Sequence, residues 1–144
     1  MKKNAMRALP WAREYKNNGQ HAQQVVAYNL LGIHQKADNK PFYAGGDVGT
    51  MQVKSARATI CKGTDIRAHV AEDGATCYGY LTYGGDLYIM TPAEYIEFVE
   101  EFAYVSRDSE SRRRRGGSNG GGVKLVLRTC AEGPEMYKWF KDRM

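Results

Sequence analysis

The sequence has few cysteines and no long apolar run. Its three cysteines, Cys61, Cys77 and Cys130, are scattered, and no C-x-x-C pair is present. This pattern argues against a zinc site and favours free thiols in a reducing cytoplasm. No apolar run approaches the ~18 residues of a membrane-spanning helix, and no apolar segment follows the basic N-terminus as in a signal peptide. We therefore expect a cytoplasmic protein without a membrane partner.

The sequence also lacks a P-loop, a heptad pattern and internal repeats. Its length and composition fit one globular domain, which we assign to residues 1–144, because 144 residues with a 42% apolar share can form a real core. Lysine and arginine number 21 against 16 acids, so the net charge is +5. This balance favours a polyanionic partner without requiring one.

One short stretch combines an acid, an amide and a lysine. Asp47 lies in a glycine-rich turn, and from residue 51 to 54 two apolar side chains alternate with Gln52 and Lys54. Alternation with a period of two is typical of a half-buried strand, so Gln52 and Lys54 share one face. The glycines let the backbone bend sharply beside Asp47. The three side chains can therefore converge and hold a divalent cation beside a phosphate.

The order Asp47, then Gln52-Val53-Lys54, resembles the acid–(Asp/Glu/Gln)–x–Lys signature of the PD-(D/E)XK nuclease superfamily. The surrounding residues, roughly 20 to 60, are similar to small phage-encoded proteins of that type. The resemblance implies an α/β (α+β) fold of restriction-endonuclease type, with a central mixed sheet flanked by helices. It also implies that Asp47 and Gln52 bind Mg²⁺ or Mn²⁺ and that Lys54 is the catalytic lysine. Hard oxygen ligands suit Mg²⁺, which clamps phosphate and activates water.

The sequence departs from the family pattern at two places. The helix before the motif usually carries a glutamate, but here Glu14 is the nearest upstream acid, and Glu14 or Gln24 is at most a weak third contributor. We interpret His21 as a surface residue. The second ligand, Gln52, brings no charge, and a site with one carboxylate holds Mg²⁺ weakly.

Local patterns predict the remaining elements. The expected helices are 19–31, ending at Gly32, 91–102 and 134–144; the expected strands are 51–60, 78–82, 87–90, 104–107 and 123–128, with an extended piece at 33–42. Residues 66–70 fit either a helix turn or a strand, and residues 1–18 are expected to form a polar arm packed through Trp11. Thr91, Pro92 and Glu94 form a capping-box signal.

Basic residues outside the motif indicate where DNA would bind. A glycine-rich loop, 108–122, contains Arg112, Arg113, Arg114 and Arg115. Glycine predicts flexibility and the arginines favour phosphate binding. Arg57 supplies a further phosphate contact. In contrast, we expect Glu94, Glu97, Glu100 and Glu101 to face solvent, away from any nucleic acid. We interpret the clustered tyrosines Tyr78, Tyr80, Tyr83 and Tyr88 as core residues rather than a base-stacking platform.

These observations leave three functions open. The leading hypothesis is a duplex-DNA-binding protein with Mg²⁺-dependent phosphodiester hydrolysis. The alternative is a non-catalytic phage-encoded inhibitor of a host defence nuclease, such as an anti-CRISPR protein that binds a CRISPR nuclease in the host cytoplasm. A small structural or regulatory phage protein is the third. A homodimer is compatible with each of them, and fold alone does not choose among them.

Overall fold

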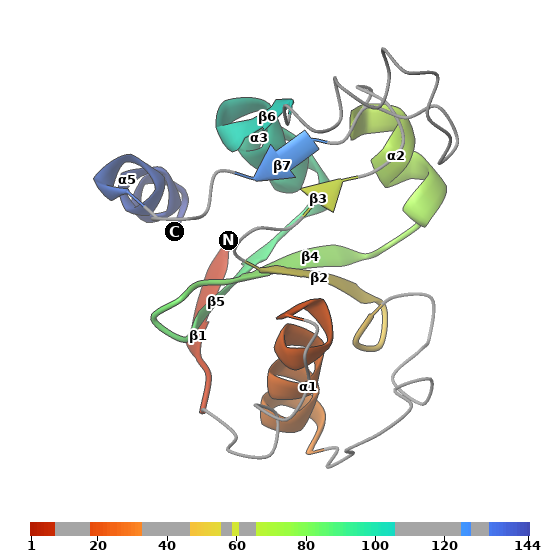
Figure 1. Cartoon of the computed structure of the whole chain (residues 1–144), viewed down its shortest axis with the longest axis vertical. Coiled ribbons are helices and arrows are strands. Elements are labelled where there is room, and N and C mark those ends of the chain that lie inside the picture. The colour runs from red at the N-terminus through yellow and green to blue at the C-terminus, as the bar shows by residue number, and fades with distance from the viewer. Residues whose placement is uncertain (8–17, 33–46, 56–58, 61–65, 106–124, 128–132) are drawn as a thin grey trace.

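The computed structural model describes residues 1–7, 18–32, 47–55, 59–60, 66–105, 125–127 and 133–144. Their elements are, in chain order, β1 Lys2–Ala5, α1 Asn18–Leu31, β2 Met51–Ser55, β3 Thr59–Ile60, α2 Ile66–Asp73, β4 Cys77–Leu81, β5 Asp86–Met90, α3 Pro92–Phe102, β6 Ala103–Val105, β7 Leu125–Leu127 and α5 Pro134–Arg143 (Figure 1). The helices predicted at 19–31, 91–102 and 134–144 are confirmed, and no end differs by more than one residue. Residues 66–70, which fitted either a helix or a strand, are helical.

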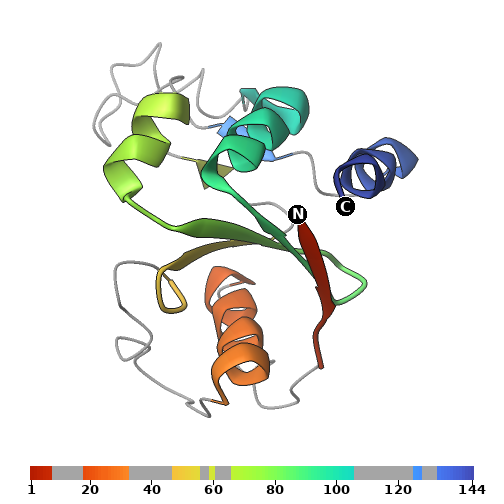
Figure 2. The ribbon, with the colours of Figure 1, turned by 180° about the vertical axis from the view of Figure 1, so that it is seen from behind.

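A four-stranded mixed sheet forms the centre of the molecule. Its order is β1-β5-β4-β2, with β2 parallel to β4 and the other neighbours antiparallel. Helix α1 covers one face, and α2, α3 and α5 lie on the other side (Figures 1 and 2). The expectation of a central mixed sheet flanked by helices is therefore confirmed.

The face beneath α1 holds an aliphatic core. Ala22, Val25, Val26 and Ala27 of the helix are buried together with Met51, Val53, Leu81 and Leu87 of the sheet. Gly79 is required where these side chains meet, because a Cβ atom there would lie 2.8 Å from Met51 Sδ and 2.9 Å from Leu87 Cδ1. The helix ends at Gly32, whose φ of 70° is typical of a glycine stop.

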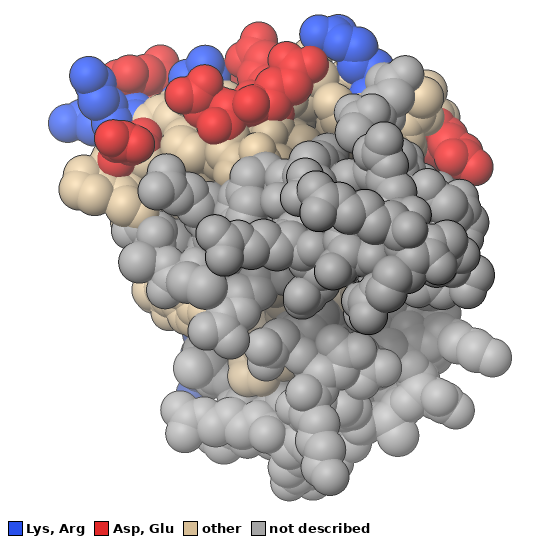
Figure 3. All heavy atoms as spheres, turned by 45° about the horizontal axis from the view of Figure 1, so that its top comes forward, with Lys and Arg blue, Asp and Glu red and all other residues tan. Residues whose placement is uncertain are grey.

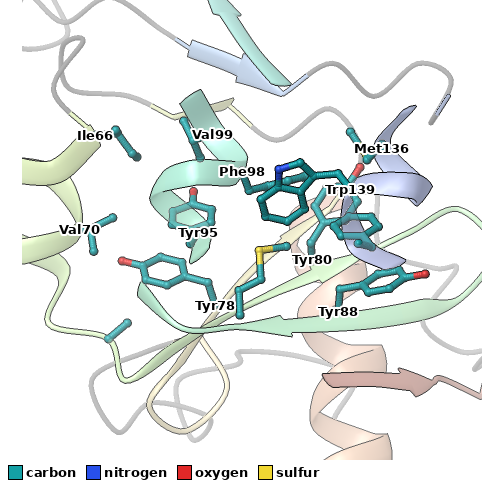
Figure 4. Close-up of a cluster of buried hydrophobic side chains, with 13 residues drawn as sticks. Ile66, Val70, Tyr78, Tyr80, Tyr88, Tyr95, Phe98, Val99, Met136 and Trp139 are labelled. Atoms are coloured by element: carbon teal, nitrogen blue, oxygen red, sulfur yellow. The ribbon is translucent and has the colours of Figure 1, made fainter. Parts of the chain in front are cut away.

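The opposite face holds an aromatic core (Figure 4). Tyr78 stacks on Tyr95 and Tyr88 stacks on Phe140, each with ring centroids 3.9 Å apart. Phe98 packs against Tyr80, Phe102, Trp139 and Phe140. The core interpretation of the tyrosines holds for Tyr78, Tyr80 and Tyr88, whereas Tyr83 is 62% exposed in the hairpin turn.

Helix α3 begins with the expected cap. The Thr91 hydroxyl accepts a hydrogen bond from the Glu94 backbone N–H at 3.2 Å, and the Thr91 N–H donates to Glu94 Oε1 at 2.9 Å. The other oxygen of Glu94 lies 3.3 Å from the terminal ammonium of Met1. Glu94 is therefore partly buried and paired, and the expectation that it faces solvent is wrong.

One predicted strand and the predicted N-terminal arm need correction. Strand β2 ends at Ser55, and Thr59–Ile60 belongs to a separate antiparallel sheet of order β3-β7-β6, so no single strand runs from 51 to 60. Residues 2–5, expected in a polar arm, form strand β1 along β5. Their side chains are exposed, so β1 forms through backbone pairing rather than through an apolar face.

Several predictions fall outside the described residues. These are Trp11, Glu14, the extended piece 33–42, Arg57, and the loop 108–122 with its four arginines. In the part of the chain that is described, no helix is long and apolar enough to cross a membrane.

Candidate functional site

Asp47 lies immediately before a tight turn that leads into β2. Val48 and Met51 exchange backbone hydrogen bonds, each 3.0 Å long, around Gly49 and Thr50. Gly49 has a φ of 59°, a conformation that glycine adopts without strain. Val48 is buried in the core beneath α1, which anchors the turn. The glycine-rich turn predicted from the sequence therefore fixes the backbone conformation next to Asp47.

The Asp47 carboxylate folds back onto β2. Its Oδ2 atom accepts a hydrogen bond of 2.9 Å from the backbone N–H of Val53. Because β2 is the last strand of the sheet, a backbone group on its outer edge has no neighbouring strand to bind. Asp47 thus has a structural role at the sheet edge, which the sequence pattern did not predict.

Gln52 and Lys54 lie on one face of β2, as the alternation predicted. Met51 and Val53 are buried toward α1, whereas Gln52 and Lys54 are partly exposed on the opposite face. Their register partners on β4 are Tyr78 and Tyr80, which belong to the aromatic core. The polar pair therefore borders that core at the free edge of the sheet.

Electrostatic coupling connects Asp47 with Lys54. Burial raises the pKa of the Asp47 carboxyl above its ordinary value and is the largest influence on it. The hydrogen bond from Val53 and the charge of Lys54 lower that pKa, and the charge of Asp73 raises it further. Among the described residues, no direct ion pair joins Asp47 to Lys54. The charge of Lys54 thus acts on the Asp47 carboxyl without a direct ion pair between the two side chains.

Asp73, at the C-terminal end of α2, is a further acid at this site that sequence reasoning missed. Its Oδ2 atom accepts a hydrogen bond of 3.1 Å from the Tyr78 hydroxyl and lies 3.5 Å from Nε2 of His69. Figure 4 shows the Tyr78 hydroxyl directed toward α2. The i, i+4 spacing of His69 and Asp73 would have indicated the pair, had residues 66–73 been recognised as a helix.

The phenols of Tyr78 and Tyr95 ionise less readily than an ordinary tyrosine. Burial, together with the charge of Asp73 and the hydrogen bond to it, raises the pKa of Tyr78 far above its ordinary value. Burial also raises the pKa of Tyr95, which is 1% exposed and whose hydroxyl has no hydrogen-bond partner within the described residues. Both tyrosines therefore stay neutral at ordinary pH, and Tyr78 donates its hydroxyl hydrogen bond to Asp73.

The outer surface of α3 carries mixed and acidic charge. Glu97, Glu100 and Glu101 are exposed there, as the sequence predicted. Arg67 lies 3.4 Å from Glu100, and Arg143 lies 3.4 Å from Glu97. Figure 3 shows acidic side chains interspersed with basic ones over the described part of this face. A DNA backbone would meet mixed and acidic charge at this surface.

The oxygen donors suited to a hard cation are Asp47, Gln52 and Asp73. Within the described residues, no group of three or more His, Cys, Asp or Glu side chains is arranged to hold a metal ion. Gln24, the weak third contributor expected from the sequence, is 0% exposed and lies in α1 on the other side of the sheet from Gln52. Any cation here would be held by few protein ligands and would need others, such as water or phosphate.

The described site thus combines two acids, Asp47 and Asp73, which precede the parallel strands β2 and β4, with Gln52 and Lys54 on one face of β2. Comparison with known proteins finds no family model, no curated protein and no solved structure that matches the chain.

Proposed function

We propose that this protein binds duplex DNA and hydrolyses phosphodiester bonds with Mg²⁺ or Mn²⁺, as a restriction-endonuclease-like member of the PD-(D/E)XK type. The main support is that the charge of Lys54 lowers the pKa of the Asp47 carboxyl, although seven positions separate the two residues in the chain. Gln52 and Lys54 also share one face of β2. This shared face, with Asp47 earlier in the chain, supports our interpretation of the three residues as the signature.

Each residue has a separate task in this proposal. Asp47 offers the carboxylate oxygen that does not bind Val53, and Gln52 offers its amide oxygen. The cation, when bound, neutralises the scissile phosphate and acidifies water at neutral pH. Lys54 carries three N–H donors and no acceptor, so it orients the attacking water or a phosphate oxygen by hydrogen bonding. The half-buried setting strengthens these interactions relative to open water.

Phosphate contacts would come from arginines outside the described residues, Arg57 and Arg112–Arg115. The net charge of +5 is compatible with such a role. Glu97, Glu100 and Glu101 are exposed on α3, which lies on the far side of the sheet from α1 (Figure 1), whereas Asp47 binds the edge strand β2. DNA would therefore approach the β2 edge and avoid α3.

One observation favours the non-catalytic alternative, an anti-CRISPR-type inhibitor of a host nuclease. Asp47 already uses one oxygen to cover the edge of β2, and Gln52 is uncharged. A nuclease-like fold that kept Asp47 for stability alone would retain the basic arginines for DNA or protein binding but would not bind a cation.

A plasmid-nicking assay separates the two functions. Supercoiled plasmid is incubated with wild type, Asp47→Asn, Lys54→Ala and the control Lys138→Ala, an exposed position on α5, in Mg²⁺ or Mn²⁺. We expect slow nicking that is stronger in Mn²⁺, lost in the first two variants and kept in the control. A wild type that binds DNA but never nicks it would support the inhibitor, and nicking that persists in Lys54→Ala would assign the activity to another site or a contaminant.

DNA binding is tested separately by its salt dependence. Replacing Arg112–Arg115 by alanine should weaken binding to all sequences alike and flatten the slope of log K against log salt, because fewer counterions are released. Lys138→Ala is again the control. An unchanged slope in the quadruple variant would remove the loop from the proposed DNA surface.

A further inference from the structure

The central sheet has two edge strands, β1 and β2, which differ in how their outer backbone groups are satisfied. An edge strand presents N–H and C=O groups that can pair with a strand of another chain. Comparing the hydrogen bonds at the two edges therefore shows which of them can accept a partner.

The outer edge of β2 is closed by the turn that precedes it. The Met51 N–H and C=O both bond to Val48, at 3.0 Å each. The Val53 N–H donates to the Asp47 carboxylate at 2.9 Å. An added strand would have to displace these contacts, so β2 is the less favourable edge for docking.

The alternation of an antiparallel pair shows which backbone groups of β1 face outward. The Met6 N–H donates to the Gly85 carbonyl at 2.7 Å, one step beyond the register pair of Ala5 with Asp86. Opposed residues alternate between hydrogen-bonded and non-hydrogen-bonded pairs, so Lys3 and Ala5 direct their N–H and C=O away from β5. Within the described residues, no hydrogen bond reaches these outward groups.

The open stretch of the β1 edge ends at Arg7. The Arg7 N–H donates to Oδ1 of Asn29 at 2.7 Å, and its carbonyl accepts a hydrogen bond of 3.0 Å from Nδ2 of Asn29. The Asn29 amide thus takes the place that a neighbouring peptide group would occupy. The edge is therefore closed at Arg7 and open at Lys3 and Ala5, whose side chains are exposed.

The charge beside the open edge limits what can dock there. Lys2, Lys3 and Arg7 are exposed, and Lys3 Nζ lies 3.7 Å from Asp86 Oδ2. Three cations beside one acid leave an excess of positive charge along β1. A second copy of the chain would bring the same lysines to the pairing, and like charges on paired strands are destabilising. An acidic segment would instead meet opposite charge.

We propose that the edge of β1 docks an extended acidic segment of a protein partner, which pairs with Lys3 and Ala5 and lengthens the central sheet. In strand addition, main-chain hydrogen bonds provide affinity and side chains provide specificity. Here the outward groups of Lys3 and Ala5 supply the hydrogen bonds, and the exposed cations select carboxylates. This surface lies at the opposite edge of the sheet from β2, so it is separate from the proposed DNA site.

The test is fluorescence anisotropy of a labelled peptide of alternating glutamate and threonine, titrated with the full chain. Ala5→Pro removes an outward N–H but no bond to β5, and proline is accepted in edge strands at such positions. It should weaken binding by about two- to tenfold, the effect of losing one hydrogen bond. Lys2→Gln should weaken it by about 1.5- to 5-fold, as expected for an exposed ion pair. The control Lys138→Ala, on α5, should bind as wild type does.

A second peptide separates strand pairing from charge attraction. The same peptide with every backbone nitrogen methylated keeps its carboxylates but has no backbone donor, so it should bind wild type at least about tenfold more weakly. Equal binding of the two peptides would overturn the proposal, and this comparison needs no protein variant.

The remaining outcomes also decide the proposal. Wild-type affinity in Ala5→Pro, shown to be folded by circular dichroism, would overturn it. So would a wild type that does not bind the acidic peptide. If Lys2→Gln weakens binding of duplex DNA while the peptide does not bind, the basic edge belongs to nucleic acid instead. Peptide binding with these dependences supports the proposal whether or not the protein nicks DNA.

Discussion

The two roles of Asp47 can be separated by comparing Asp47→Asn with Asp47→Ala. Asparagine keeps a side-chain oxygen that can accept the 2.9 Å hydrogen bond from Val53, but it removes the charge. Alanine removes both. Losing the acceptor of a partly buried backbone N–H costs about 1–3 kcal/mol in the free energy of unfolding. For a chain of this length each kcal/mol corresponds to roughly 3 °C in Tm, so Asp47→Ala should melt about 3–9 °C below Asp47→Asn.

The charge has the opposite effect on stability. Burial, with a further contribution from Asp73, holds the pKa of Asp47 above its ordinary value of 3.8. The folded state therefore binds the proton more tightly than the unfolded state, and stability falls as the pH rises from 3.8 through the raised pKa. Asp47→Asn has no such loss, so at neutral pH without divalent cations it should be at least as stable as wild type.

The assay is thermal and urea unfolding of the three proteins in EDTA, from about pH 4 to pH 8. The difference between Asp47→Asn and wild type should grow in favour of the variant as pH rises. Equal melting of Asp47→Asn and Asp47→Ala would refute the role of the hydrogen bond. An Asp47→Asn variant that is less stable than wild type at neutral pH would refute the argument from burial.

Four further predictions concern the framework. Thr91→Ala should lower Tm by about 3 °C, because it removes an N-cap worth about 1 kcal/mol, while Thr91→Ser should melt as wild type does. Burial works to raise the pKa of Glu94, but the backbone hydrogen bond at Thr91 and the terminal ammonium outweigh it, so the pKa of Glu94 is lowered from 4.5. The stability that the Glu94 carboxylate supplies is therefore present above pH 4.5 and is lost as the pH falls through the lowered pKa. Glu94→Gln should flatten that part of the pH dependence of stability, measured by urea unfolding at a series of pH values. Phe140→Ala should cost about 3–5 kcal/mol in chemical unfolding, and an equally small effect of Phe140→Ala and Lys138→Ala would contradict the docking of α5. Gly79→Ala should cost about 1–3 kcal/mol because Met51 and Leu87 must shift, and a melting temperature equal to wild type would show that they move freely.

Local signals in the sequence predict much of the fold. The capping box at Thr91 and the glycine stop at Gly32 each depend on backbone geometry that a few adjacent residues determine. The same holds for the shared face of Gln52 and Lys54, which follows from the two-residue period of a strand. Asp47, Gln52 and Lys54 could therefore be selected without knowledge of the remaining chain.

Features that depend on distant pairing could not be predicted. Strand β1 has exposed polar side chains, and only its backbone bonds to β5 make it a strand. Thr59–Ile60 belongs to a second sheet because β7, far along the chain, pairs with it. The charge of Asp73 acts on Asp47 although the two are distant in sequence, because α2 leads into β4 and β4 pairs with β2. Nothing adjacent to these residues in sequence carries that information.

The pairing of β1 with β5 also constrains the order in which the molecule folds. Lys2 is aligned with Ile89, so β1 pairs with a strand that is synthesised much later. Closing so long a loop is entropically slow, and β1 should join the sheet after the β4–β5 hairpin, whose contacts are local. Before β1 pairs with β5, the charges of Lys2 and Lys3 oppose its association with other chains. Lys2 and Lys3, which are exposed and outside the core, thus oppose aggregation of the incompletely folded chain.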